Sequence, residues 1–426
     1  MECYKKEDWT DSMIEQEAAR LRAACSCEVE SLSFVGAFIM NDVKRGAART
    51  IDRQLNRTKV IVEQDQVIEF DSVSSAILPN DPYFKEQWSL SDNQNDADIN
   101  AQQGWEEYLT DNQGGDPNGP STIVAVIDTG VDYTHPDLRD TMWVNPAEIP
   151  NNGKDDDENG IIDDIHGADC TLSKCRGDPM DVEGHGTHCA GIIGATYNNG
   201  EGIAGLAGPA KGKVKILACK TGVGKGFAFS AALRCMNSAI SMGATILSNS
   251  WSSPNMAKCW PWILENTVDQ LYVFAAGNGD DDDIGYELTA ECTEMGCCTR
   301  QPNLLCVGAS DSFDKKAEFS NYGKDFVHVF APGVSIYSTW LDDPATRSLM
   351  DPRYKHSSGT SMACPLVAGL AALLATMQDQ FNVTEIKTMI EKNVNKKDHY
   401  KDLVSSGGLI DAEKTIRSLK EAKPGM

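Results

Sequence analysis

The chain has 426 residues, of which 63 are acidic and 38 are basic, so its formal net charge at neutral pH is −25. A chain this acidic is a poor partner for nucleic acid or for an anionic lipid surface, and we expect neither. The sequence contains no run of about 18 apolar residues, so we also expect no membrane span.

Fourteen cysteines is a high count for a chain of this length. They lack the paired C-x-x-C spacing of a zinc site, so we expect disulfides, although the spacing does not predict their pairing. Disulfides favour a secreted protein or one of the secretory pathway. The start, MECYKKEDWT, has no apolar segment typical of a signal peptide, which does not fit that expectation.

The first part of the chain mixes helical and strand-like patterns. These patterns predict a helix over residues 14–24, a strand over residues 31–39 and a closing strand or hairpin over residues 59–70. Together they indicate a small α+β domain over residues 13–71, preceded by a tail over residues 1–12. Stretches rich in Pro, Gly and Asn then mark residues 72–120 as a linker and the entry to a second domain.

From residue 121 the pattern changes to short apolar runs, which are typical of strands buried on both faces of a parallel sheet. These runs occupy residues 121–130, 213–220, 244–251, 270–278 and 304–310. Helical patterns alternate with them, over residues 186–196, 229–243 and 361–378. This alternation predicts an α/β domain with a doubly wound, mostly parallel sheet over residues 121–418.

Polar residues follow the carboxyl ends of these runs, where open parallel sheets bind their ligands. Asp128 ends the first run, Asn278 follows the fourth, and Ser361 begins the last helix. A serine that attacks a carbonyl needs a base, and that base needs an orienting carboxylate. The stretch DVEGHGTHCAG supplies His185 and His188, which a helix would place on one face, so their spacing does not choose between them.

Six stretches together resemble one family, the subtilisin-like serine proteases or subtilases. They are VAVIDTGVDYTHPDL (124–138), GHGTHCAGIIGA (184–195), AAGN (275–278), AEFSNYG (317–323), APGVSI (331–336) and SGTSMACPLVAG (358–369). The resemblance implies a three-layer subtilisin-like catalytic domain. It also implies that Asp128, His185 and Ser361 are the catalytic triad, that Asn278 forms an oxyanion hole, and that His188 is structural.

By the same resemblance, a peptide substrate binds as an added strand between two extended walls. The walls would be Ser250, Trp251 and Ser252 on one side and Gly224, Lys225 and Gly226 on the other. Family members usually have glycine where Ser252 stands, so the resemblance does not fix the cleavage preference.

An acidic stretch, NNGKDDDENGIIDD (151–164), resembles a calcium-binding loop, because acids at alternate positions and a glycine turn supply the oxygen ligands that calcium prefers. The position of the last EF-hand glutamate is taken by His166, so this is no true EF-hand. The expected ligands are Asp155, Asp157, Asn159 and Asp164.

The subtilase resemblance implies a second calcium site, because the chain matches the family's segments for it. Its ligands would be the side chains of Asp81, Asp137 and Asn199 and the main-chain oxygens of Tyr197, Glu201 and Ile203. Calcium is therefore the expected cofactor, and it would stabilise the folded chain by binding only that form.

The resemblance further implies that residues 13–71 are a propeptide, which assists folding, inhibits the enzyme and is removed by self-cleavage near residues 70–75. The expected function is that of a self-processing, calcium-stabilised serine endopeptidase of the subtilisin subclass, a monomer that acts on proteins or peptides. The alternative is a catalytically inactive binding protein with the same fold. A sedolisin would lack the histidine of GHGTH, and a furin-like convertase would continue into a β-rich domain, so the sequence favours neither.

Overall fold

A computed structural model describes residues 78–91, 95–111, 121–224, 226–253, 259–280, 284–289, 291–292, 296–342, 351–378 and 380–422, with short pieces of the first 62 residues. The chain divides into two compact units, Met1–Ser74 and Ser75–Met426. In the described part of the chain, no helix combines the length and the apolar character needed to cross a bilayer.

The first unit contains a four-stranded sheet in the order β2-β3-β1-β4. Its strands are β1 (Glu2–Cys3), β2 (Glu28–Leu32), β3 (Ala37–Asn41) and β4 (Ile61–Val62). The single strand expected over residues 31–39 is wrong, because Ser31 pairs with Phe38 and Leu32 with Ala37 in antiparallel register. The apolar pattern continues through both strands, so the periodicity of the sequence predicted a single strand.

The residues that we assigned to an N-terminal tail include β1, which pairs with both β3 and β4. A strand of two residues carries no periodic signal, which is why the sequence did not indicate it. Most of the expected helix over residues 14–24 and of the expected closing strand over residues 59–70 lies outside the described residues.

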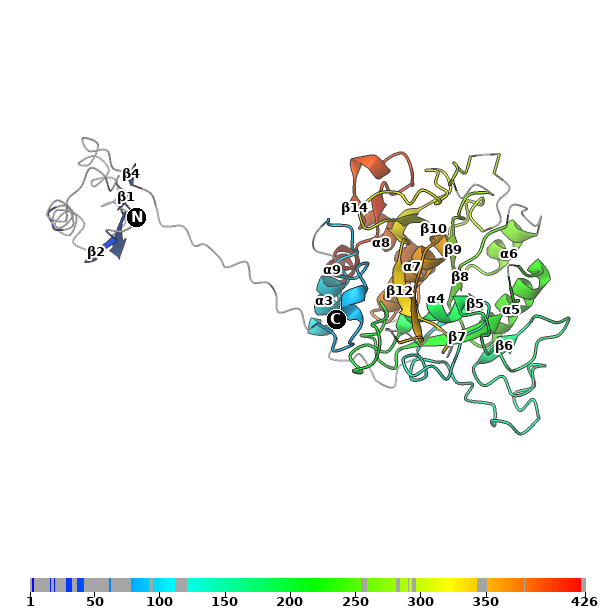
Figure 1. Cartoon of the computed structure of the whole chain (residues 1–426). Helices are drawn as coiled ribbons and strands as arrows, with labels where there is room; N and C mark the ends of the chain where they lie inside the picture. The colour runs from blue at the N-terminus through cyan, green and yellow to red at the C-terminus, as the bar shows by residue number, and fades with distance from the viewer. Residues whose placement is uncertain are drawn as a thin grey trace. The chain divides into compact units, whose positions relative to one another are not determined.

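The second unit is built on a nine-stranded sheet in the order β14-β15-β11-β10-β9-β8-β5-β7-β6 (Figure 1). Its strands are β5 (Thr122–Asp128), β6 (Gly167–Asp169), β7 (Val214–Lys220), β8 (Ile246–Asn249), β9 (Leu271–Ala275), β10 (Leu304–Ser310), β11 (Val329–Pro332), β14 (Asn395–Lys396) and β15 (Gly408–Leu409). Every neighbouring pair is parallel except β14 with β15. Each of the five predicted buried strands is therefore present.

Helices cover both faces of this sheet, and a separate hairpin lies beside it (Figure 1). The helices are η2 (Phe84–Glu86), α3 (Ala101–Asp111), α4 (His185–Gly194), α5 (Phe229–Ser241), α6 (Trp260–Asn266), α7 (Thr360–Ala375), α8 (Val383–Lys392), η4 (Asp398–Tyr400) and α9 (Ala412–Ala422). The hairpin consists of β12 (Ile336–Thr339) and β13 (Tyr354–Ser357).

Two hydrophobic cores lie on opposite faces of the sheet, and alternate residues of β5 enter each of them. Val124 and Val126 join the core formed with α4 and α7, while Ala125 and Ile127 join the core formed with α5 and α6. A strand that is apolar at every position is expected when both faces are covered. The predicted doubly wound α/β fold is thus confirmed.

The segment before β5 packs onto the same unit. Trp105 in α3 is buried, its indole N–H donates to the Leu206 carbonyl at 2.9 Å, and its ring meets that of Tyr197 edge to face. Helix α3 also packs against α9 near the other end of the described chain. These contacts bring the stretch that carries Asp81 against the loop that follows α4.

Candidate active site

Asp128 and His185 form the first pair of the expected triad. Asp128 is the last residue of β5 and is 4% exposed, and His185 is the first residue of α4. The Nδ1 atom of His185 lies 2.7 Å from Oδ1 of Asp128. This carboxylate is the main cause of a raised pKa at His185, because its charge stabilises the imidazolium.

His188 has a different environment, which separates the two histidines that spacing could not. It is fully buried, and its Nε2 lies 3.1 Å from the Ile336 carbonyl oxygen and 3.0 Å from that of Lys355. Because both neighbours only accept, Nε2 carries the hydrogen and donates it. Burial lowers the pKa of His188 to about 3, so the ring is neutral and joins α4 to both strands of the hairpin.

Two hydroxyls of the same hairpin hold the first turn of α4. Thr339 Oγ1 donates to the Thr187 carbonyl at 2.7 Å, and Ser338 Oγ donates to the His188 carbonyl at 2.8 Å. Gly191 faces these hydroxyls, and a Cβ there would lie 2.2 Å from Thr339 Oγ1. The close approach of β12 to α4 therefore fixes the start of the helix, where His185 lies.

Ser361 is the second residue of α7, beyond the carboxyl ends of β8 and β9. Its Oγ donates to the Ser250 carbonyl oxygen at 2.9 Å. A hydroxyl has one hydrogen to donate, so in this rotamer the hydrogen points to Ser250 and not to His185. Hydrogen bonds between a nucleophile and its base are often long or poorly aligned before a substrate binds, and rotation of the Ser361 side chain would redirect this one.

Asn278 follows β9 and is held against the start of α7. Its Oδ1 accepts hydrogen bonds from the backbone N–H and the hydroxyl of Thr360, both at 2.8 Å. With Oδ1 fixed, the amide Nδ2 remains as a donor. A Cβ on Gly359 would lie 3.3 Å from this Nδ2 and 3.6 Å from the Ser361 nitrogen, so glycine leaves space where two N–H donors approach each other.

The expected substrate walls line a cavity of about 260 Å³ beside His185. Its lining contains Gly224, Gly226, Ser250 and Trp251 together with Asp128, Thr129, Glu183, His185, Gly222 and Phe227. The Trp251 indole donates to the Ile127 carbonyl at 3.0 Å, and its ring packs edge to face on Phe227 and Phe274. Ser252 is exposed next to this wall, and Lys225 lies outside the described residues.

The acidic loop over residues 151–164 brings three carboxylates together. The oxygens of Glu148, Asp157 and Asp164 lie within 4.8 Å of one another, and Glu148 and Asp164 are buried. Burial raises the pKa of Asp164 to about 6. Asp155 is not in this group: its two carboxylate oxygens accept the backbone N–H groups of Asn159 and Gly160 and so shape the turn.

Glu148 is the residue that sequence reasoning missed, because it precedes the acidic loop and its place depends on how the loop folds back. Its carboxylate accepts N–H groups from Asp156 at 2.7 Å and from Asp163 at 3.1 Å. Asn159 lies beside the three carboxylates and donates from Nδ2 to Asp164 at 2.8 Å.

The second expected calcium site brings together segments that are far apart in the sequence. The Asp81 carboxylate accepts hydrogen bonds from the backbone N–H groups of residues 198 and 199. The Asp137 carboxylate accepts hydrogen bonds from the backbone N–H of Ile203 and from the side-chain amide of Asn199. Asp137 is fully buried, and burial raises its pKa to about 7. Tyr197 and Glu201 belong to the same loop, and Tyr197 is buried while Glu201 is exposed.

Three disulfides join cysteines of the described chain, as the high cysteine count led us to expect. They are Cys170–Cys175, Cys292–Cys298 and Cys297–Cys306. Five further described cysteines are free: Cys189, Cys219, Cys235, Cys259 and Cys364. Cys189 lies one turn after His185, and its thiol donates to the Ser361 carbonyl at 3.5 Å.

Residues 119–408 match the subtilase family. The matched range includes the parallel strands β5–β11 and the residues that meet at the rim of the sheet. The chain therefore belongs to the subtilases, the subtilisin-like family of serine proteases.

Among its relatives, subtilisin-like protease 1 of Plasmodium berghei (strain Anka) is 27% identical over 98% of this chain and 69% of its own length. A thermophilic serine proteinase of Bacillus sp. (strain AK1) is 34% identical over 84% of this chain and 73% of its own length. The solved structure of a protease from Pseudoalteromonas arctica PAMC 21717 is 22% identical and superimposes with a TM-score of 0.60, covering 80% of this chain and 99% of that one. The last likeness supports the fold alone.

Proposed function

We propose that this protein is a serine endopeptidase of the subtilisin subclass, which hydrolyses proteins or peptides through Asp128, His185 and Ser361. The observation that carries this proposal is the 2.7 Å contact of His185 with Asp128, on the rim where Ser361 lies in the first turn of α7. Asp128 would orient His185 and stabilise its imidazolium form. The inactive binding protein is the weaker alternative, because the acid, the base, the nucleophile and Asn278 are all present.

In the proposed reaction, His185 Nε2 takes the proton of Ser361 as Oγ attacks the substrate carbonyl. The oxyanion that forms would accept hydrogen bonds from Asn278 Nδ2 and from the Ser361 backbone N–H. His185 then gives its proton to the leaving amine, and water repeats the sequence on the acyl-enzyme. The extended walls beside His185 would hold the peptide as an added strand, with Trp251 in contact with a substrate side chain.

A fluorophosphonate probe tests this assignment, because it reacts only with an activated serine. The mature protein should gain one probe mass on the peptide that contains Ser361, and the Ser361→Ala variant should gain none. Labelling of the variant at another serine would contradict the proposed nucleophile. So would a folded wild-type protein that gains no label.

The raised pKa of His185 gives the proposed reaction a pH dependence. Protonated His185 cannot accept the serine proton, so kcat/KM should rise with pH through the pKa of His185. Asp128→Asn removes the main cause of the raised pKa, so the rise should move to lower pH while kcat falls about 10⁴-fold. Profiles of kcat/KM against pH measure both effects, with Asp132→Asn as the matched control. An unmoved profile in Asp128→Asn would exclude this role for Asp128.

We also propose two calcium sites. The site at Asp81 and Asp137 has the ligand set expected above, and the acidic-loop site has Asp157, Asn159 and Asp164 with Glu148 in place of Asp155. The buried carboxylates of Asp137 and Asp164 fit such a cation, since a buried charge is costly unless it is paired or coordinated. The described hydrogen bonds to these two carboxylates come from neutral donors, which are side-chain amides, a backbone N–H and a tyrosine hydroxyl. Calcium would supply structural charge compensation at both places, without a part in the reaction.

Removal of calcium should lower the stability of the folded protein. At a free calcium concentration about 100-fold above Kd, each site contributes about 3 kcal/mol to the free energy of unfolding. Thermal unfolding of the Ser361→Ala variant, which cannot digest itself, should therefore show a lower Tm in chelator. Asp137→Asn and Asp164→Asn should each remove part of the difference, and magnesium should not restore it. An equal Tm with calcium and with chelator would contradict both sites.

The remaining proposals concern maturation and location. We propose that residues 13–71 act as an inhibitory propeptide removed by self-cleavage, and that the mature enzyme is a monomer. Disulfides persist in oxidising compartments, which supports a secreted protein or one of the secretory pathway. N-terminal sequencing of the purified protein should find a new start near residues 70–75 in the wild type and not in Ser361→Ala.

A further inference from the structure

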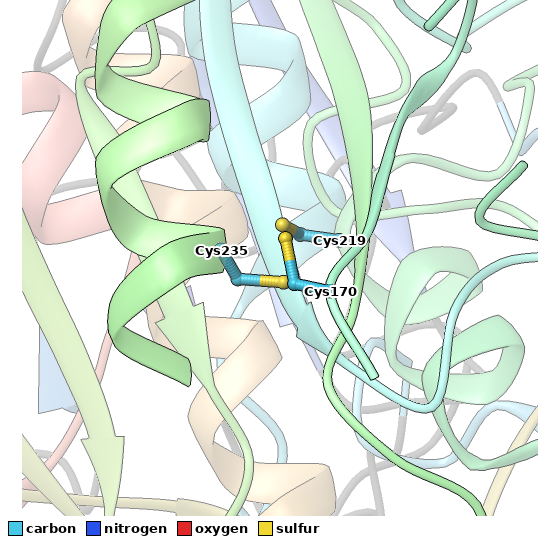
Figure 2. A group of neighbouring side chains, drawn as sticks. All are labelled: Cys170, Cys219 and Cys235. Atoms are coloured by element: carbon cyan, nitrogen blue, oxygen red, sulfur yellow. The ribbon is translucent and has the colours of Figure 1, made fainter. Parts of the chain in front are cut away.

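Four cysteines gather on the face of the sheet that α5 covers, where Cys219 of β7 pairs with Ile127, the residue before Asp128 in β5. Cys170 follows β6, Cys219 lies in β7 and Cys235 lies in α5. The three sulfurs lie within 4.8 Å of one another and are fully buried, and Figure 2 shows them meeting between the helix and the strand. Cys170 is also disulfide-bonded to Cys175, which is partly exposed.

The sheet explains why these sulfurs meet. Ala168 of β6 pairs with Cys219 of β7, and the Cys170 N–H donates to the Lys220 carbonyl at 2.8 Å. Side chains two residues apart along a strand point to the same face, so Cys170 and Cys219 both face α5. Cys235 reaches this face from the helix, and its thiol donates to the same Lys220 carbonyl at 3.4 Å.

The two free thiols of this group lie before and after one of the substrate walls in the chain. Cys219 is the second-last residue of β7, shortly before the wall that contains Gly224 and Gly226, and Cys235 lies in the helix that begins just after this wall. A bond between these two cysteines would close a loop around the whole wall.

We propose that Cys170, Cys175, Cys219 and Cys235 form one dithiol–disulfide exchange site, in which the disulfide of the outer pair is passed to the inner pair. The outer pair is Cys170 and Cys175, and the inner pair is Cys219 and Cys235. Only the outer pair has a partly exposed member, so it is the pair that small disulfides or thiols such as glutathione reach from solvent.

The exchange takes two displacement steps. The Cys235 thiolate attacks Cys170 Sγ, the Cys170–Cys175 bond breaks, and Cys175 leaves as a thiolate that takes up the proton lost by Cys235. The Cys219 thiolate then attacks Cys235 Sγ, and Cys170 leaves and takes up the proton lost by Cys219. One disulfide and two thiols are present before and after, so the transfer consumes no outside oxidant.

The two pairings differ in what they constrain. The Cys170–Cys175 disulfide closes a short loop, with a sequence separation of 5, while a Cys219–Cys235 disulfide encloses residues 220–234. A longer closed loop restricts the unfolded chain more, and this one would fasten β7 to α5 on both sides of the substrate wall. Burial raises the pKa of the Cys219 thiol, so the second displacement should be slower than the first.

Disulfide mapping of the full chain tests the exchange. The protein is equilibrated in glutathione buffers of graded redox ratio and quenched in acid. Free thiols are then alkylated in denaturant, and the unreduced protein is cleaved for mass spectrometry. We expect a Cys219–Cys235 peptide pair to appear as the Cys170–Cys175 pair declines. The proposal is overturned if Cys219 and Cys235 are alkylated at every redox ratio while only the Cys170–Cys175 disulfide is reduced and re-formed.

Two variants examine the intermediate. After treatment with oxidised glutathione, Cys219→Ser should accumulate a Cys170–Cys235 disulfide, because the second displacement has lost its thiol, and Cys235→Ser should keep Cys170–Cys175 with Cys219 alkylated. Cys259→Ser removes an exposed free thiol outside this group and should map like the wild type. A Cys219→Ser protein that keeps only the Cys170–Cys175 disulfide, with Cys235 alkylated, would exclude the first displacement.

The effect on the wall rests on the proposed peptidase function and has its own measurement. The two disulfide forms should differ in KM for a peptide substrate by about threefold or more, because the loop that binds the peptide is fastened in only one of them. Equal KM values would overturn the connection to the wall. Absence of hydrolysis in both forms would contradict the peptidase function and leave the mapping result standing.

Discussion

Replacing Ser361 by alanine is expected to lower kcat by about 10⁶-fold, the scale known for the triad of a subtilisin, a relative of this protein. The reason is that the reaction then has no nucleophile, while the peptide-binding walls are unchanged. Hydrolysis of a generic peptide substrate measures the loss. Ser358→Ala is the matched control, and it should leave kcat unchanged. Ser358 stands three residues before Ser361, and its exposed hydroxyl accepts a hydrogen bond from the Ser335 N–H.

A double variant distinguishes a triad from independent contributions. If His185 acts only by taking the proton of Ser361, then His185→Ala should add almost nothing to the loss already caused by Ser361→Ala. Losses that multiply would show that His185 has another role. Turnover that survives in Ser361→Ala would move the nucleophile elsewhere.

Replacing Asn278 by alanine is expected to lower kcat by about 10²- to 10³-fold, the loss known for the oxyanion-hole asparagine of a subtilisin. The Nδ2 donor is aimed at a charge that develops only in the transition state, so KM should change little. Steady-state kinetics with one peptide substrate separates the two constants. A raised KM with an unchanged kcat would mean that Asn278 binds the substrate in its ground state.

Thr360 offers a matched pair of variants for the same test, because its hydroxyl and its N–H both hold Asn278 Oδ1. Thr360→Ser keeps both hydrogen bonds and should retain kcat. Thr360→Val keeps the size and the backbone contact but loses the hydroxyl, so the asparagine amide is held less firmly and kcat should fall part of the way. Equal kcat in the two variants would mean that the backbone bond alone orients Asn278.

The part of the fold that the sequence could predict depends on local patterns. The five buried strands and helices α4, α5 and α7 are continuous runs of apolar or periodic residues, and each signal lies within the element itself. The candidate triad was also local information, since Asp128, His185 and Ser361 each lie in a short motif. Local patterns failed where the chain reverses, as at the antiparallel partners Leu32 and Ala37.

The sequence by itself determined the fold class, the family resemblance and the candidate residues of the triad, because each rests on neighbours in the chain. The tertiary structure decided the environments of His185 and His188, since packing of the hairpin buries His188 while His185 lies on Asp128. It also brought Glu148 to the acidic loop and Cys235 to Cys170. Contacts of this kind join residues far apart in the chain, and no periodicity or spacing in a single sequence records them.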